Sequence, residues 1–118
     1  EFIYDYPASQ AALAKIHTAS DGKMYADRFE LYLGGMELCN GYCELTNATE
    51  QAERFKEDLA LRKKMGKELP KEDRRFLDAL EHGLPECSGV ALGFDRLVML
   101  ALSKKDIREV ILFPGDIA

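Results

Sequence analysis

The sequence contains no tryptophan, no long apolar run and no excess of positive charge. Its longest apolar stretch, Leu97–Leu102, is far shorter than the roughly 20 residues that cross a bilayer, and no signal-peptide pattern is present. A formal net charge of -5 argues against a broad basic surface that grips nucleic acid. We therefore expect a soluble, cytoplasmic chain that does not bind a membrane and is not itself an RNA-binding module.

Cysteine is also scarce, with three residues, Cys39, Cys43 and Cys87, and no Cys-x-x-Cys pair. A zinc site would need a fourth ligand from His17 or His82, at irregular spacing. Small, mostly buried, reduced thiols of a cytosolic protein are the better interpretation.

The composition is otherwise that of a globular protein, with 47% apolar and 31% charged residues. The 118 residues are enough for one domain around one core. The chain opens inside an aromatic run, Phe2–Tyr6, without an initiator methionine. We therefore expect a piece cut from a longer protein, whose upstream part stays open.

Apolar periodicity predicts strands and helices that are partly segregated along the chain. The expected strands are 2–6, 28–33, 36–45 and 89–94, and the expected helices are 9–16, 47–66, 71–82 and a buried 97–102, with a polar loop at 17–23. Ser9 is the expected N-cap of the first helix, and Asn47 with Glu50 forms a capping box for the second, which stops at Gly66. Because strands and helices do not alternate, the fold class should be α+β with a mostly antiparallel sheet flanked by helices.

One group of residues that could carry chemistry is Gly89–Leu97. Small residues alternate on one strand face, which lets a flat molecule approach the backbone. Asp95 can cap the next helix, and Arg96 at that helix's N-terminus favours an anion. The pattern suits a planar base beside phosphates. Spacing alone equally allows a packed core strand with a salt-bridged arginine.

A second group combines Glu30, Glu37, Asn40, Tyr42 and Glu44. Carboxylates suit Mg²⁺ bound with nucleotide phosphates, and equally suit a substrate ammonium group. Plain turns with exposed glutamates are the alternative. Because Glu37 and Glu44 are seven residues apart, an unbroken strand would point them to opposite faces. A bulge or tight turn at 40–41 or at 34–35 would relieve this conflict.

Together the two groups resemble the lysyl-tRNA synthetase branch of the class II synthetases over nearly the whole chain. The resemblance rests on Arg28-Phe29-Glu30, Gly34-Gly35, Glu37-Leu38-x-Asn40-Gly41-Tyr42-x-Glu44-Leu45, Glu50-Gln51-x-x-Arg54-Phe55, Gly83-Leu84-Pro85 and Gly89–Leu97. It implies that residues 1–118 are the C-terminal part of a class II catalytic domain, including motif 3 but not motifs 1 and 2. The parent protein would then be a homodimer, and the isolated chain inactive.

In that family the segment around Gly93 and Arg96 would bind ATP. Gly93 would lie against the adenine, and Arg96 would act as the catalytic contact to the triphosphate. Glu37 and the backbone of Leu38 would bind ATP and its Mg²⁺, with Glu30 as the second metal carboxylate. The implied chemistry is attack of a carboxylate on the α-phosphorus of ATP, which gives an adenylate and pyrophosphate.

The implied amino-acid pocket is lined by Asn40, Tyr42, Glu44 and Ala91. Within the branch the chain is most similar to the elongation factor P β-lysine ligases, in Tyr6-Pro7-Ala8-Ser9-Gln10, Pro85-x-Cys87-Ser88-Gly89-Val90-Ala91-Leu92-Gly93 and 97–102. These activate β-lysine and transfer it to a lysine of elongation factor P. Lysyl-tRNA synthetases usually carry glycine at the position of Ala91. The chain departs from the ligase pattern at Cys39, Tyr42, Cys43 and Phe94.

Two other functions stay open at this point. A lysyl-tRNA synthetase fragment would charge tRNA with lysine, and its parent would carry an anticodon-binding domain. A catalytically silent paralogue would serve as a binding or regulatory module. The presence of Glu30, Glu37, Glu44 and Arg96 argues against the silent alternative.

Overall fold

The computed structural model describes residues 1–115. The elements are β1 Phe2–Pro7, η1 Ala8–Gln10, β2 Ile16–Thr18, β3 Met24–Leu33, β4 Met36–Cys43, α1 Ala48–Lys64, α2 Arg74–His82, β5 Ser88–Leu92, α3 Phe94–Ala101 and η2 Ile107–Glu109. The sheet runs in the order β1-β3-β4-β5, with β2 also paired to β3, and every pairing is antiparallel. The α+β class is confirmed.

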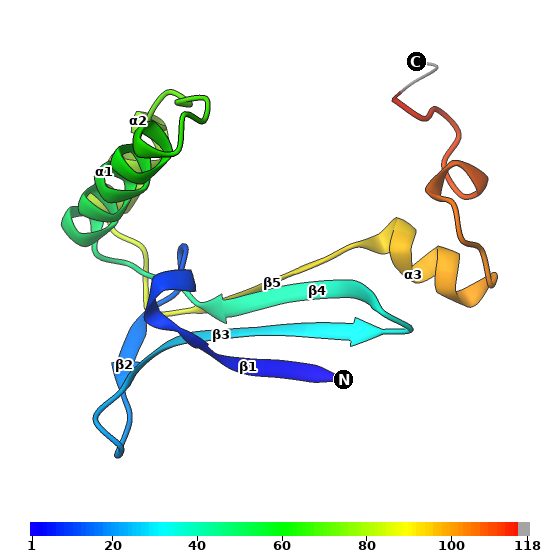
Figure 1. Ribbon diagram of the computed structural model, residues 1–118, viewed down its shortest axis with the longest axis horizontal. Helices are drawn as coiled ribbons and strands as arrows, with labels where there is room; N and C mark the ends of the chain where they lie inside the picture. Colours follow the sequence, from blue (N-terminus) through cyan, green and yellow to red (C-terminus); the bar gives the residue numbers. More distant parts are fainter. Residues whose placement is uncertain (116–118) are drawn as a thin grey trace.

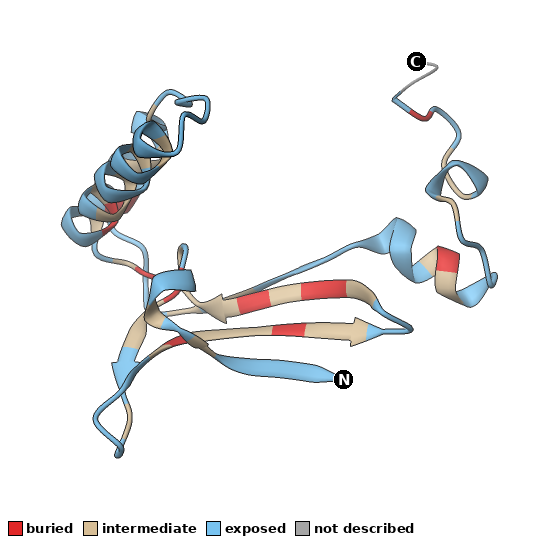
Figure 2. Cartoon of the chain, viewed as in Figure 1, coloured by how far each residue is buried: buried red, intermediate tan, exposed pale blue. Residues whose placement is uncertain are grey.

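The helices lie beyond the ends of the strands, with α1 and α2 at one end and α3 at the other (Figure 1). The Cα radius of gyration is 17.3 Å, whereas a compact domain of this length would have about 13–14 Å. Most buried residues lie in the middle of the sheet and in the loops that adjoin it, with isolated buried positions in the three helices and near residue 114 (Figure 2). The single core expected from the sequence is therefore small, and its main cluster is Ala11, Ala14 and Ala26.

Local helix signals are confirmed at α1. The Asn47 side chain accepts a hydrogen bond from the Glu50 backbone N–H at 2.9 Å, and the helix ends just before Gly66, whose φ is +65°. Helix α2 begins at Arg74, three residues later than predicted, because Asp73 caps it through the Phe76 N–H.

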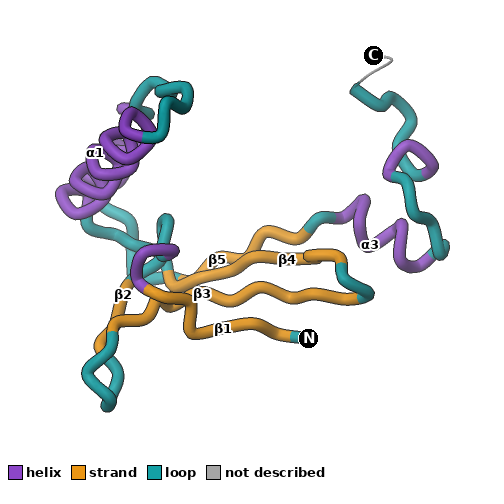
Figure 3. Tube along the Cα trace, viewed as in Figure 1, coloured by secondary structure: helices purple, strands orange, loops and turns teal. Residues whose placement is uncertain are grey.

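The predicted helix at 9–16 is wrong. Its backbone instead forms η1, a turn and the start of β2 (Figure 3). Arg54 of α1 donates to the carbonyl oxygens of Ala12 at 3.2 Å and Ala14 at 2.7 Å, and Ala12 has a positive φ of 52°. Because these carbonyls bond to a distant side chain, the intrahelical ladder does not form.

The prediction of a buried last helix is also wrong, since Met99 is the only residue of α3 that is buried. The cysteines are free, with Cys39 buried and the other two half-buried. Among the helices within 1–115, none is long and apolar enough to cross a membrane.

Candidate functional site

The residues that are predicted to line the amino-acid pocket share one face of the sheet. Glu30 of β3 pairs with Asn40 of β4, and Asn40 pairs with Ala91 of β5. Tyr42, two residues further along β4, pairs with Gly89. Since directly paired residues point to the same face, these side chains form two neighbouring rows, and we call this surface the polar face.

Glu44 reaches the polar face from just beyond β4. A β-carbon built on Gly89 would lie 2.3 Å from Oε1 of Glu44, which is far inside contact distance. The glycine therefore leaves room for the carboxylate of Glu44. The small residues of this strand predicted the approach of a flat ligand, whereas at Gly89 the approaching group is the side chain of Glu44.

A β-bulge brings Glu37 to the same face. Leu31 pairs with Cys39 but Tyr32 pairs with Glu37, so Leu38 has no partner on β3. The extra residue changes the alternation, and Glu37 shares its face with Tyr32. The bulge is thus at Leu38 and not at 40–41, where Asn40 and its neighbour keep regular pairing. The predicted tight turn at 34–35 is confirmed, with φ values of +60° and +79°.

The predicted ATP residues meet where β4 adjoins the start of α3. The Gly93 N–H donates to the Leu38 carbonyl at 2.8 Å, and Arg96 Nη1 donates to the Glu37 carbonyl at 2.8 Å. Arg96 Nη1 also lies 3.8 Å from Oε2 of Glu37. Gly93 is the N-cap and no side chain caps the helix, so the predicted capping role of Asp95 is wrong and the first N–H groups of α3 stay open.

Glu30 lies in a dense polar network. Its Oε2 accepts from the Tyr32 hydroxyl at 2.7 Å, while its Oε1 accepts from Arg28 and, at 3.5 Å, from Asn40. The Arg28 guanidinium lies 4.6 Å above the centre of the Tyr6 ring. Sequence reasoning missed Arg28, Tyr32 and Tyr6 as site residues. Strict alternation of Arg28, Glu30 and Tyr32 along one strand was the available signal.

The network lowers the pKa of Glu30 and raises the pKa of both Tyr32 and Tyr6. The hydrogen bond from Tyr32, followed by contacts with Tyr6 and Arg28, lowers the pKa of Glu30 against the opposing effect of burial. Burial, and then the neighbouring Glu30, raises the pKa of Tyr6 to about 12. Glu30 is therefore an anion, and Tyr6 a neutral phenol, across the physiological range.

We expect Glu30→Gln to lower stability at pH 7 by about 1–3 kcal/mol, because it removes a charge that accepts several hydrogen bonds. Because the pKa of Glu30 in the folded protein lies below its usual value of 4.5, the charged carboxylate stabilises the folded state above pH 4.5. This stabilisation is lost as the pH falls through the pKa that Glu30 has in the folded protein. The difference in the free energy of unfolding between wild type and variant should thus shrink below about pH 4.5. Urea unfolding at a series of pH values measures it. Glu53→Gln is the control, because Glu53 forms an exposed ion pair with Lys56. A stability difference between wild type and Glu30→Gln that does not change with pH would contradict the lowered pKa of Glu30.

Among residues 1–115 no group of three or more acidic, histidine or cysteine side chains gathers as a metal site. Mg²⁺ that arrives with phosphates needs only one or two carboxylates. Glu37 could serve in this way, because within residues 1–115 its half-exposed carboxylate forms a single ion pair, the 3.8 Å contact with Arg96. Both oxygens of Glu30 already accept hydrogen bonds, so binding Mg²⁺ there would require one of those bonds to open.

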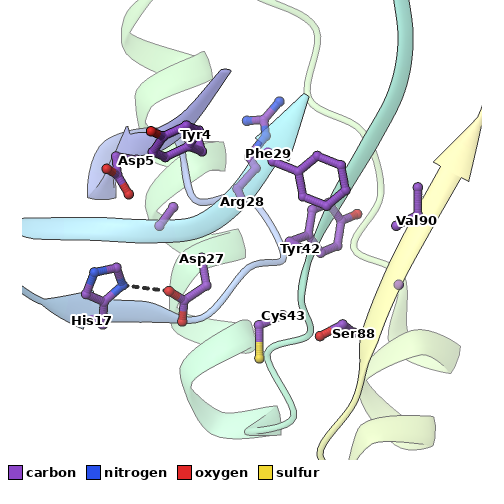
Figure 4. Close-up of a pocket in the computed structure, with 12 residues that line it drawn as sticks. Tyr4, Asp5, His17, Asp27, Arg28, Phe29, Tyr42, Cys43, Ser88 and Val90 are labelled. Carbon is purple, nitrogen blue, oxygen red and sulfur yellow. Dashed lines mark hydrogen bonds and ion pairs between the residues drawn. The ribbon is translucent and has the colours of Figure 1, made fainter. Parts of the chain in front are cut away.

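A separate hollow of about 300 Å³ lies on the opposite face (Figure 4). Tyr4, Phe29 and Val90 line it, and His17 Nδ1 lies 2.6 Å from Oδ1 of Asp27 at its edge. Tyr42 is the only residue of the predicted amino-acid pocket that lines this hollow, although Gly89 and Val90 of the Gly89–Leu97 segment border it as well. The candidate site is therefore the polar face together with the junction of β4 and α3.

Comparisons with known proteins identify the family to which the sequence is similar. A family model described as tRNA synthetases class II (D, K and N) matches residues 1–117. Three curated relatives, each named elongation factor P--(R)-beta-lysine ligase, come from Proteus mirabilis (57% identical over 115 residues), Vibrio cholerae (56% over 113) and Pseudoalteromonas translucida (56% over 112). The matches cover 96%, 96% and 95% of this chain but 34% of each relative, so the chain spans about a third of their length.

Proposed function

The chain belongs to the class II tRNA synthetases (D, K and N), and from this premise we propose that it forms part of an ATP-dependent ligase. The ligase activates lysine or β-lysine as an adenylate and transfers it to elongation factor P. The names and identities of the curated relatives support this acceptor. In this proposal residues 1–118 are the C-terminal part of the catalytic domain of a homodimeric cytoplasmic enzyme, and are inactive alone.

The observation that carries the proposal is the convergence of two residue groups far apart in sequence. Glu37 and Leu38 of β4 hold Gly93 and Arg96 through backbone hydrogen bonds of 2.8 Å. The same strand continues into the polar face with Asn40. A nucleotide and an amino acid bound side by side along β4 would bring their reacting groups together, which supplies much of the catalysis in such reactions.

In the nucleotide part, Gly93 would lie against the adenine and the open N–H groups of α3 would face phosphate oxygens. Arg96 would stabilise the charge that develops on the triphosphate. Glu37, with Glu30 as the second carboxylate, would hold Mg²⁺, which supplies charge neutralisation when bound. Within this proposal Glu37 is the more accessible of the two carboxylates.

In the amino-acid part, Glu44 would bind a substrate ammonium group, since its carboxylate lies over Gly89 on the polar face. The Asn40 amide would donate a hydrogen bond to the substrate from between Glu30 and Ala91. The Tyr42 ring would pack along the aliphatic side chain of the substrate. Ala91 would set the depth of the pocket beside Asn40.

The test is pyrophosphate exchange by the full-length enzyme with lysine and with β-lysine, followed by transfer assays with elongation factor P and with tRNA. Activation with transfer to elongation factor P supports the proposal. Transfer to tRNA alone would instead establish the lysyl-tRNA synthetase alternative. Absence of exchange with either amino acid would leave the silent binding module as the function.

We expect Ala91→Gly to favour α-lysine relative to β-lysine in the full-length enzyme. Removing one methyl group from the pocket changes discrimination between similar substrates by about 1–3 kcal/mol, or roughly five- to a hundredfold. The ratio of kcat/KM values in pyrophosphate exchange measures the effect. Val90→Ala is a matched control, because Val90 points to the opposite face and lines the other hollow. An unchanged ratio for Ala91→Gly would remove this residue from the specificity argument.

A further inference from the structure

A cavity of about 620 Å³ opens where the β3–β4 hairpin meets α3. Glu37 and Arg96 line one part of it, and the segment after α3 lines another part through Lys105. This volume falls in the range of ligand-binding pockets. The cavity therefore joins the predicted ATP residues to a cation that the sequence analysis did not single out.

The end of α3 directs this segment back toward the hairpin. The Lys104 N–H donates to the Met99 carbonyl at 2.7 Å, and the Ser103 N–H donates to the Leu100 carbonyl at 3.1 Å. Ser103 has a positive φ of 55°. These are the bonds of a Schellman turn, which reverses the chain directly after the helix and brings the next residues to the cavity.

Lys105 differs from the charged residues around it. Lys104 pairs with Glu109 at 2.9 Å, and Asp106 pairs with Arg108 at 2.6 Å. Lys105 itself forms no ion pair or side-chain hydrogen bond with any residue of the described range 1–115. Its ammonium group is thus a charge at the cavity without a partner in the described residues.

We propose that Lys105 binds the terminal phosphates of ATP, beside Arg96. This rests on the function proposed above and extends its nucleotide site. A triphosphate carries more negative charge than one Mg²⁺ and one guanidinium neutralise. Glu37 adds a further negative charge to the same cavity, as does Asp106, whose carboxylate is paired with Arg108. A flexible lysine serves as a point charge for phosphate without a fixed geometry.

The test compares ATP with AMP in calorimetric titrations of the full-length enzyme in the presence of Mg²⁺. Lys105→Gln should weaken ATP binding roughly three- to tenfold and leave AMP binding unchanged, because AMP lacks the terminal phosphates. In pyrophosphate exchange, KM for ATP should rise by a similar factor with kcat nearly constant. Lys105→Glu should weaken ATP binding further, since it reverses the charge.

Lys104→Gln is the matched control, because its ammonium is already paired with Glu109. Equal losses for ATP and AMP, or equal losses in the two lysine variants, would overturn the role of Lys105. Failure of the wild-type enzyme to bind ATP or to catalyse exchange would overturn the proposed function instead. The two failures are therefore distinguishable.

Discussion

Replacing Arg96 with alanine is expected to slow adenylate formation by about a hundred- to a thousandfold, the usual cost of removing one group that stabilises transition-state charge. The hydrogen bond that the side-chain Nη1 donates to the backbone carbonyl of Glu37 holds the guanidinium at the open N-terminus of α3. In the proposed ATP complex, the helix dipole and the cation would thus act on the same phosphates. Pyrophosphate exchange by the full-length enzyme at saturating lysine and ATP measures the loss as a fall in kcat.

Arg74 provides the control for this prediction. It is the first residue of α2, and within residues 1–115 the ion pair of its exposed side chain is with Glu72 alone, at 3.7 Å. Arg74→Ala therefore removes an arginine from the start of a helix outside the site. Arg96→Lys should restore only part of the rate, since lysine keeps the charge but not the planar fork. Arg96→Ala with wild-type kcat would contradict the catalytic role of Arg96.

Gly89→Ala is expected to raise KM for the amino acid by about ten- to a hundredfold, while the protein stays folded. The new methyl group would occupy the position of Glu44 Oε1, which lies 2.3 Å from the built β-carbon. A flexible carboxylate can swing away at small cost in stability, but it then loses its charged contact with the substrate, worth about 1.5–3 kcal/mol. The KM for the amino acid in pyrophosphate exchange measures the loss of substrate binding, and the thermal unfolding temperature shows whether the protein stays folded.

A double-mutant cycle with Glu44→Gln identifies the mechanism. If Gly89 acts by leaving room for Glu44, the combined variant should lose little more than Glu44→Gln alone, because both changes remove one interaction. Additive losses would show that Gly89 acts on the ligand independently. Gly41→Ala should behave differently, since its β-carbon would lie 2.7 Å from Phe29 and Val90 on the opposite face. It is expected to lower stability more than it changes KM.

Features fixed by short stretches of chain were predicted well. The capping of α1 by Asn47, the stop before Gly66 and the glycine turn at 34–35 depend on bonds and φ values within a few residues. The class II family also followed from motif residues quoted along nearly the whole chain, and a match over 1–117 confirms it. The assignment of roles to Glu37, Asn40 or Arg96 stays a prediction.

The sequence predictions were wrong where a distant part of the chain forms hydrogen bonds with the backbone of a segment or determines whether its side chains are buried. The predicted helix at 9–16 loses its carbonyl partners to Arg54 of α1. The apolar segment 97–102 continues α3 to Ala101, but only Met99 is buried because the helix lies beyond the end of the strands (Figure 2). Neither outcome depends on the residues within the segment itself.

By itself, the sequence determined the residue types of the site, the antiparallel α+β class and the family, because these depend on local periodicity and motif content. Only the tertiary structure decided that Glu37 and Glu44 share one face. The bulge at Leu38 changes the alternation of β4, and its position depends on how β3 pairs with β4. Strand register is a long-range property, which no short stretch of chain specifies.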